Sequence, residues 1–176
     1  MKNYWQTQST ETVFRCPWFT VGYDNIKTPD DDLKQYYWID RPQNALAIVA
    51  IKRDKVVMIE QYRPKLKQLF LECPGGHVET DESYVDAAAR ELREETGITA
   101  NEFIHLTTYY PTATMRYERA ILIAQDLSEG DPMPDEQEYI EWEYVPAEKA
   151  IELATTQPTS GWTLTSLLMA REQGYI

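Results

Sequence analysis

Short apolar runs separated by turn-forming residues recur along most of the chain and predict a domain rich in β-strands. Within the first forty residues, the acidic and turn-rich stretch NIKTPDDDLK interrupts this pattern, which favours a small antiparallel sheet. The apolar runs around it are TVFRC, WFTVGY and QYYWID. The pattern changes near Arg41 and Pro42. We therefore predict an N-terminal β-rich segment over residues 1–41 and a main domain over residues 42–176.

In the main domain, strands, one helix, more strands and then two helices follow one another. The runs ALAIVAIK and KVVMIEQY flank the turn residues Arg53 and Asp54, and they predict a hairpin with one very apolar strand in the core. Further strands are predicted from LFLEC, FIHLTTYY, RAILIAQDL and YIEWEYV. The last two helices are predicted to begin near Pro146 and Gly161. This order predicts a layered α/β or α+β domain with a mixed sheet.

The first helix has well-marked ends. Ser83 is a suitable N-cap, with Asp86 three residues later, and Gly97 is a natural C-terminal stop. The helix should therefore run from about Tyr84 to Thr96. At about 100° per residue, five side chains share a face that we expect to pack on the sheet. They are Val85, Ala88, Ala89, Leu92 and Thr96.

Three glutamates, Glu91, Glu94 and Glu95, occupy an adjoining arc of the same helix. Glu91 and Glu95 form an i,i+4 pair of like charges, which costs a few tenths of a kcal/mol on an exposed helix. In one interpretation, Arg90, Arg93 and solvent compensate this repulsion. In the other, a bound cation does.

The residues before the helix favour the cation. The sequence PGG lets the backbone turn sharply and bring the carbonyl of Gly75 close to the acidic arc, and Glu82 adds a fourth carboxylate. Carboxylates and a backbone carbonyl form the all-oxygen site that Mg²⁺ or Mn²⁺ prefers. We therefore predict a divalent metal at this helix.

Charge and composition limit the partners of the chain. The 17 basic and 29 acidic side chains leave a formal charge of −12, which repels duplex DNA and anionic membrane surfaces. A phosphate-bearing ligand would need a local positive charge, and a divalent cation could supply it. Only two cysteines occur, the first residues lack an apolar signal-like region, and no apolar run approaches about 20 residues. We expect a soluble protein of the reducing cytoplasm.

Residues 76–98 resemble the Nudix box, written G-x5-E-x7-R-E-U-x-E-E-x-G-U with U an aliphatic residue. Every defined position is filled, which makes a chance match in one short chain very improbable. The matching residues are Gly76, Glu82, Arg90, Glu91, Leu92, Glu94, Glu95, Gly97 and Ile98. The resemblance implies the Nudix α/β/α sandwich, a catalytic helix within a loop-helix-loop, and hydrolysis of a nucleoside diphosphate linked to another group X.

The resemblance also assigns roles around the box. Glu91 and Glu95 are the preferred metal ligands, and Glu94 is a third ligand or supports the other two. The carbonyl of Gly75 is a backbone ligand, while Glu82 would ligate through water or brace the loop. Arg90 would orient the carboxylates by bidentate pairing, and it is counted with Glu95 among the catalytic residues.

Outside the box, the chain is similar to the ADP-ribose pyrophosphatase branch, which also hydrolyses nucleoside diphosphate sugars. The similarity rests on EQYRP, LECPGGHVE, Tyr110-Pro111 and an acidic loop before the last strand. In that branch the general base often lies on this loop, where Glu138 is our first choice and Glu136 the second, although an acidic loop needs no catalytic explanation. Arg63 of EQYRP could contact the pyrophosphate, with Arg116 and Arg119 as weaker alternatives.

This branch often forms dimers through its N-terminal segments, so a homodimer is expected. Several N-terminal aromatic residues could lie at the interface, stack on a base or pack in the core: Trp18, Phe19, Tyr36, Tyr37 and Trp38. His77 and His105 are not needed as ligands of an all-oxygen site, and we interpret Cys73 as a small buried residue.

One departure concerns the substrate. Relatives commonly have a Ser-Pro-Gly type turn near the position of Pro111, whereas this chain has PTATMRYE without glycine. ADP-ribose or a nucleoside diphosphate sugar is the first choice. Dinucleoside polyphosphates, RNA 5′ ends and damaged nucleotides remain as alternative substrates, and a non-catalytic nucleotide sensor is an alternative from another class.

Overall fold

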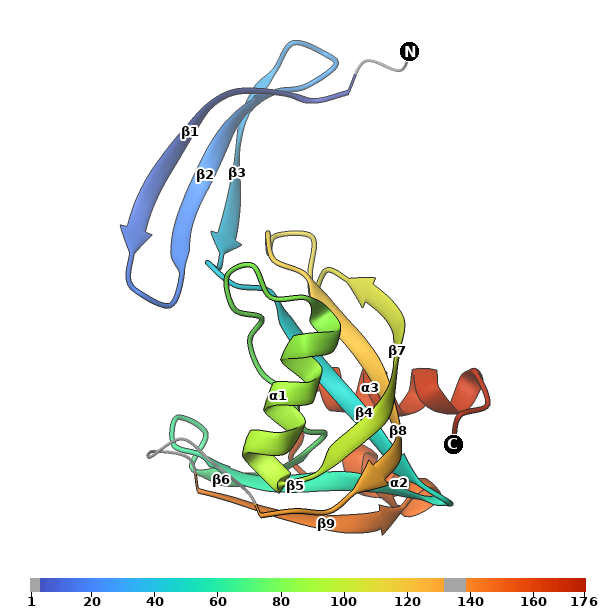
Figure 1. The fold of residues 1–176 in the computed structure, drawn as a ribbon. Helices are drawn as coiled ribbons and strands as arrows, with labels where there is room; N and C mark the ends of the chain where they lie inside the picture. Colours follow the sequence, from blue (N-terminus) through green and yellow to red (C-terminus); the bar gives the residue numbers. More distant parts are fainter. Residues whose placement is uncertain (1–3, 132–138) are drawn as a thin grey trace. The chain divides into compact units, whose positions relative to one another are not determined.

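The structure, a computed structural model, describes residues 4–131 and 139–176. The chain divides into two compact units. One comprises Met1–Asn44 together with Tyr109–Glu118, and the other comprises Ala45–Thr108 together with Arg119–Ile176. The N-terminal unit therefore includes a later segment, which the sequence had placed in the loop region after the first helix. Figure 1 shows the elements of both units.

The N-terminal unit is a three-stranded antiparallel sheet, as predicted. Its strands are β1 (Gln6–Arg15), β2 (Thr20–Lys27) and β3 (Leu33–Asp40), in the order β1-β2-β3. Trp38 is the main buried aromatic residue of this sheet, with 7% of its surface exposed. Its ring lies against Gly22, where any Cβ would come within 2.4 Å of the ring. Trp38 therefore packs in the core, whereas the other four aromatic residues considered above do not.

Residues 109–118 are attached to β3 by backbone hydrogen bonds. Ile39 donates its N–H to the carbonyl of Thr114 at 2.8 Å, and it accepts from the N–H of Arg116 at 2.9 Å. The guanidinium of Arg116 lies over the ring of Trp38, 4.7 Å from its centroid. This cation–π contact is of the kind that contributes up to about 2 kcal/mol when shielded from water.

The main unit is built on a six-stranded mixed sheet. Its strands are β4 (Ala45–Lys52), β5 (Lys55–Arg63), β6 (Gln68–Glu72), β7 (Thr99–Tyr109), β8 (Arg119–Ser128) and β9 (Ile140–Pro146). The order is β6-β5-β4-β8-β7, and β9 pairs with β5. β4 runs parallel to β8 and antiparallel to β5, and seven of its eight residues are buried. The sequence predicted both the mixed sheet and the very apolar strand.

Among the described residues, three helices cover the sheet: α1 (Tyr84–Thr96), α2 (Ala147–Thr156) and α3 (Gly161–Glu172). Leu46 and Ile48 of β4 pack with Ala88 and Leu92 of α1 in one buried cluster. Alternate residues of a strand point to opposite faces, so the neighbouring β4 residues point to the other side of the sheet. There α3 packs on β4 and α2 packs on β5 and β9 (Figure 1). The predicted α/β/α sandwich is thereby confirmed.

Helix α1 has the predicted limits, but its buried face was predicted only in part: Ala88, Leu92 and Thr96 are buried, as expected, whereas Val85 and Ala89 are not. Ser83 caps the first turn by accepting the N–H of Asp86, and Gly97 ends the helix in the left-handed region with φ 73°. Val85 is 41% exposed and Ala89 is also exposed. The stripe turned toward the sheet instead follows the spacing i, i+3, i+4 and i+7. Its buried members are Ala87, Ala88, Leu92, Glu95 and Thr96.

In the part of the chain that the structure describes, none of the helices combines the length and the apolar character needed to cross a membrane.

Candidate active site

The glycine loop before α1 lies alongside β4. Leu46 donates its N–H to the carbonyl of Gly76 at 2.9 Å, and Ile48 donates to the carbonyl of Pro74 at 2.8 Å. Because carbonyl directions alternate along an extended segment, the carbonyl of Gly75 points away from β4. Gly75 itself has φ 152°, and a Cβ there would lie 2.3 Å from the carbonyl oxygen of Leu46. The close approach of loop and strand therefore requires glycine.

Arg90 forms ion pairs with three carboxylates near this loop. Its Nε and Nη2 donate to the two oxygens of Glu82, each at 3.0 Å. Its Nη1 donates to Glu91 at 2.9 Å and to Glu94 at 3.0 Å, and Nη2 also donates to the carbonyl of His77 at 2.9 Å. All five N–H groups of the guanidinium are thus used. The predicted pairing of Arg90 with the acidic residues is present in the structure.

Glu95 is held by the backbone of the loop. Its carboxylate accepts the N–H of Gly75 at 2.9 Å, and only 6% of the residue is exposed. The last turn of α1 is thereby attached to the segment that follows β6. Glu91 and Glu95 both lie on the side of the helix that faces the sheet, so these two members of the acidic arc border the core rather than open solvent.

Electrostatic stabilisation is strongest between Arg90 and Glu82. The hydrogen bonds from Arg90 lower the pKa of the Glu82 carboxyl below its ordinary value, and the backbone N–H of Glu79 adds to the effect. The same contacts raise the pKa of Arg90 above its ordinary value. Glu82 therefore braces the loop in its charged form, which is one of the two roles proposed for it from the sequence.

The second glycine of the loop leaves room for Glu91. A Cβ on Gly76 would lie 2.3 to 2.5 Å from the carboxylate oxygens of Glu91. The clash is with the end of a side chain, so Gly76→Ala should displace this carboxylate while the fold survives. We expect kcat/KM to fall about tenfold, with little change in melting temperature. Steady-state kinetics and calorimetry of Gly76→Ala, with Gly161→Ala as control because its Cβ would contact nothing within 4 Å, check this expectation.

The oxygen donors match in kind what a hard divalent cation requires. In the structure, however, Glu82, Glu91 and Glu94 share Arg90, while Glu95 binds a backbone N–H. Among the described residues, no three His, Cys, Asp or Glu side chains are arranged around a common metal position. Arg90 therefore supplies positive charge to Glu82, Glu91 and Glu94 in this arrangement.

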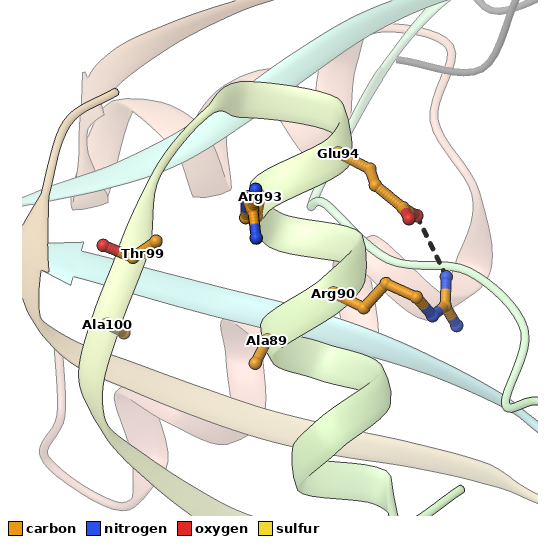
Figure 2. A pocket seen from close by; sticks show the side chains of 6 residues that line it. All are labelled: Ala89, Arg90, Arg93, Glu94, Thr99 and Ala100. Atoms are coloured by element: carbon orange, nitrogen blue, oxygen red, sulfur yellow. Dashed lines mark hydrogen bonds and ion pairs between the residues drawn. The ribbon is translucent and has the colours of Figure 1, made fainter. Parts of the chain in front are cut away.

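A shallow groove of about 520 Å³ opens beside this network. Figure 2 shows it between the outer face of α1 and the start of β7, with Arg90 and Glu94 joined at its edge. The six lining residues are Ala89, Arg90, Arg93, Glu94, Thr99 and Ala100. Glu94 is 38% exposed, more than Glu82 or Glu91, so it is the most accessible carboxylate of the Arg90 network.

Each of the three other predicted arginines has a contact of its own. Arg63 binds the carboxylate of Glu72, at 2.8 Å from Nε. Arg119 lies over the ring of Trp162, 4.5 Å from its centroid. Arg116 belongs to the N-terminal unit, where it stacks on Trp38. The two proposed general bases, Glu136 and Glu138, lie outside the described residues.

Glu72 was not among the predicted site residues. It is 1% exposed, although it is charged and stands at the end of a strand. The signal available was a single acidic residue in the otherwise apolar LFLEC. Its neighbour Cys73 is buried, as interpreted, and burial together with the charge of Glu72 raises its pKa to about 12. Such a thiol stays protonated near neutral pH and is no nucleophile.

The two histidines lie at the edges of the site. The carbonyl of His77 accepts from Arg90, as described above. The ring of His105 stacks on Tyr84 with centroids 5.6 Å apart, and its Nε2 is hydrogen-bonded to Thr108 at 2.8 Å. Both residues therefore have structural contacts that need no metal.

Residues 40–166 match the NUDIX domain, and this match covers more than half of the chain. The chain belongs to the NUDIX family. An ADP-ribose pyrophosphatase of Bacillus subtilis (strain 168) is 28% identical over 156 residues, which are 86% of this chain and 84% of that protein. The ADP compounds hydrolase NudE of Escherichia coli (strain K12) is 30% identical over 140 residues, 72% of this chain and 73% of that protein.

A solved structure extends the comparison of this NUDIX chain to its whole length. A crystal structure of an ADP compounds hydrolase superposes with a TM-score of 0.86 and 25% identity, covering 99% of this chain and 98% of the other. These similarities confirm the predicted branch and the predicted class of enzyme, a Nudix pyrophosphohydrolase.

Proposed function

We propose that this enzyme hydrolyses the pyrophosphate bond of a nucleoside diphosphate linked to a second group, with ADP-ribose or a nucleoside diphosphate sugar as substrate, and that it depends on a divalent metal. The observation that carries the proposal is the Arg90 network, in which one guanidinium collects three carboxylates in front of the glycine loop. The relatives named for ADP-ribose and ADP compounds support the substrate class.

The proposed metal ligands are oxygen atoms of helix α1 and of the loop that precedes it. Glu91 and Glu95 are the first choices, with the carbonyl of Gly75 and the carboxylates of Glu94 and Glu82 completing the set. Mg²⁺ or Mn²⁺ bound there would lower the pKa of a water molecule and neutralise charge that develops on the diphosphate. The hard oxygen donors support either ion.

The remaining residues would position the metal ligands and the substrate, and would deprotonate the attacking water. Arg90 holds Glu91 and Glu94 in place, so the acidic side chains need little reorganisation when substrate arrives. Arg63 would bind the diphosphate, since a guanidinium matches phosphate oxygens. For the general base we keep Glu138 first and Glu136 second. A carboxylate near the attacking water would accept its proton as the phosphorus–oxygen bond forms.

A substrate panel tests the proposal. Purified protein is incubated with ADP-ribose, nucleoside diphosphate sugars, a dinucleoside polyphosphate, a triphosphorylated RNA and an oxidised nucleotide, with Mg²⁺ and Mn²⁺ in parallel. AMP and ribose 5-phosphate from ADP-ribose, formed only with metal, are the expected products. Turnover confined to the last three compounds would reject the proposed substrate class. Nucleotide binding without any product would indicate a sensor instead.

A homodimer formed through the N-terminal sheet belongs to the same proposal, together with a cytoplasmic location. All ten residues of β1 are exposed in the single chain, and Trp18 next to it is 69% exposed. The exposed apolar residues here include Val13, Phe14 and Trp18, and exposed apolar surface commonly marks an interaction site. Light scattering should give twice the chain mass of 20.5 kDa. Trp18→Ser should shift the mass toward the monomer, whereas Leu66→Ser, at a residue 59% exposed in the main unit, should not.

A further inference from the structure

A buried carboxylate in the main unit has no role in the proposed chemistry so far. Glu72 ends β6, and 1% of it is exposed, which makes it the most buried carboxylate among the described residues. Burial of an unpaired charge is very unfavourable, so its partners must compensate it. Both of its oxygens accept hydrogen bonds, Oε2 from Arg63 and Oε1 from Trp162.

The contact with Arg63 uses one edge of the guanidinium. Nε donates to Oε2 of Glu72 at 2.8 Å, and Nη2 donates to the same oxygen. Among the described residues, these are the hydrogen bonds of the Arg63 side chain, and neither involves Nη1. The Arg63 side chain is 37% exposed, whereas Glu72 is enclosed. The edge formed by Nη1 and Nη2 is the one that can hold two phosphate oxygens side by side.

The carboxylate is itself fixed by α3. Trp162, in the first turn of that helix, donates its indole N–H to Oε1 of Glu72 at 3.2 Å. The next residue, Thr163, accepts the N–H of Cys73 at 3.0 Å. Helix α3 therefore holds the carboxylate of Glu72 and also the backbone N–H of the next residue, Cys73. The orientation of Glu72 is thus set by the packing of α3 against the end of β6.

Glu72 also adjoins the acidic site along the chain. Three residues later, Gly75 donates its N–H to Glu95, and the carbonyls on either side of Gly75 bond to β4. One short segment thus holds Arg63 through Glu72 and the last turn of α1 through Gly75. This arrangement connects the proposed phosphate-binding residue with the proposed metal ligands.

We propose that Glu72 is a positioning residue. It occupies the Nε edge of Arg63 so that the Nη1 edge is presented to the diphosphate of the substrate, and Trp162 fixes the carboxylate in that orientation. This inference rests on the proposed function, because it needs a diphosphate substrate. Glu72 does not touch the substrate, and its effect passes through Arg63.

A double-mutant cycle tests the coupling. If Arg63 binds the diphosphate equally in the ground and transition states, Glu72→Gln should raise KM for ADP-ribose about tenfold while kcat changes by less than about threefold. Arg63→Gln should raise KM at least as much, and the double variant should resemble Arg63→Gln alone. Glu129→Gln, which removes the exposed pair with Lys52, is the matched control and should match the wild type.

Trp162→Phe gives a second variant that keeps an aromatic side chain but removes the indole N–H and makes the ring system smaller. It should raise KM by a smaller factor than Glu72→Gln. Circular dichroism and melting temperature establish that each variant is folded. If Glu72→Gln fails to fold, Trp162→Phe combined with Arg63→Gln completes the same cycle.

A spectroscopic measurement separates this inference from the proposed function. In ¹⁵N NMR spectra, the Nε–H signal of Arg63 can be assigned by its absence in Arg63→Lys. This proton should be protected from exchange with solvent in the wild type and should exchange rapidly in Glu72→Gln. Inorganic pyrophosphate with Mg²⁺ should shift this signal in the wild type but much less in Glu72→Gln. These results can hold even if the substrate panel gives no product, in which case only the proposed function fails.

Two outcomes would overturn the positioning role. One is a double variant whose KM increase equals the product of the two single increases. The other is a pyrophosphate-induced shift of the Arg63 signal that is the same in the wild type and in Glu72→Gln. Either result would reduce Glu72 to a structural ion pair.

Discussion

Replacing Glu95 by Gln is expected to lower the hydrolysis of ADP-ribose at least about a hundredfold while the protein stays folded. In the wild type, the backbone nitrogen of Gly75 lies 2.9 Å from a carboxylate oxygen of Glu95. Glutamine keeps the shape of the side chain and an oxygen that can accept the same hydrogen bond. Only the negative charge is removed. Since the residue is 6% exposed and borders the core, its charge contributes little to solubility and should matter mainly for a bound cation.

The measurement compares kcat and the Mg²⁺ dependence of the rate in the wild type and in Glu95→Gln. Glu148→Gln serves as a matched control, because Glu148 is an exposed residue in the first turn of α2. Titration calorimetry with Mn²⁺ should show weaker binding for Glu95→Gln alone. A rate for Glu95→Gln equal to that of the wild type would exclude Glu95 as a ligand and would refute the proposed site.

The ends of α1 could be predicted because they are set by local interactions. The hydroxyl of Ser83 satisfies the N–H of Asp86 within the same turn, and Gly97 adopts a left-handed conformation that other residues avoid. The strands of the sheet could be predicted for a related reason. Their apolar runs are bounded by turn residues, and β4 has so few polar positions that it must be buried.

The orientation of α1 could not be predicted from hydrophobicity. Glu91 and Glu95 face the sheet side of the helix, while the apolar Val85 and Ala89 are exposed. A prediction based on polarity alone places the glutamates of the helix on the side facing solvent. The structure turns them inward because Arg90 and the N–H of Gly75 satisfy them there.

The Glu72 network lay beyond sequence reasoning for a different reason. Arg63 and Glu72 are nine residues apart on paired strands, and Trp162 is ninety residues from Glu72. No local rule specifies that a helix near the C-terminus will place an indole N–H beside the end of β6. Such contacts follow from tertiary packing. In the sequence itself, the only sign of this network was one acidic residue in an otherwise apolar strand.

Replacing Arg90 by Gln is the second change with a large expected effect. It leaves Glu82, Glu91 and Glu94 without the cation that they share, and Glu82 and Glu91 are only 15% and 14% exposed. We expect kcat/KM to fall about ten- to hundredfold, because the carboxylates lose their fixed positions. The free energy of unfolding near neutral pH should fall by about 1 to 3 kcal/mol.

The pH dependence of this loss gives a sharper test than its size. The pKa of Glu82 in the folded protein lies below its ordinary value of 4.5, chiefly because of Arg90. Its contribution to stability is therefore complete above that value and is lost as the pH falls through the lowered pKa. Urea unfolding of the wild type and Arg90→Gln should show a stability difference that is constant near neutral pH and shrinks as the pH falls below 4.5. Arg93→Gln removes the same charge from an exposed position of the same helix, and its small difference should stay nearly constant. A difference for Arg90→Gln that does not change with acidification would mean that Glu82 draws its stabilisation from the loop backbone rather than from the guanidinium.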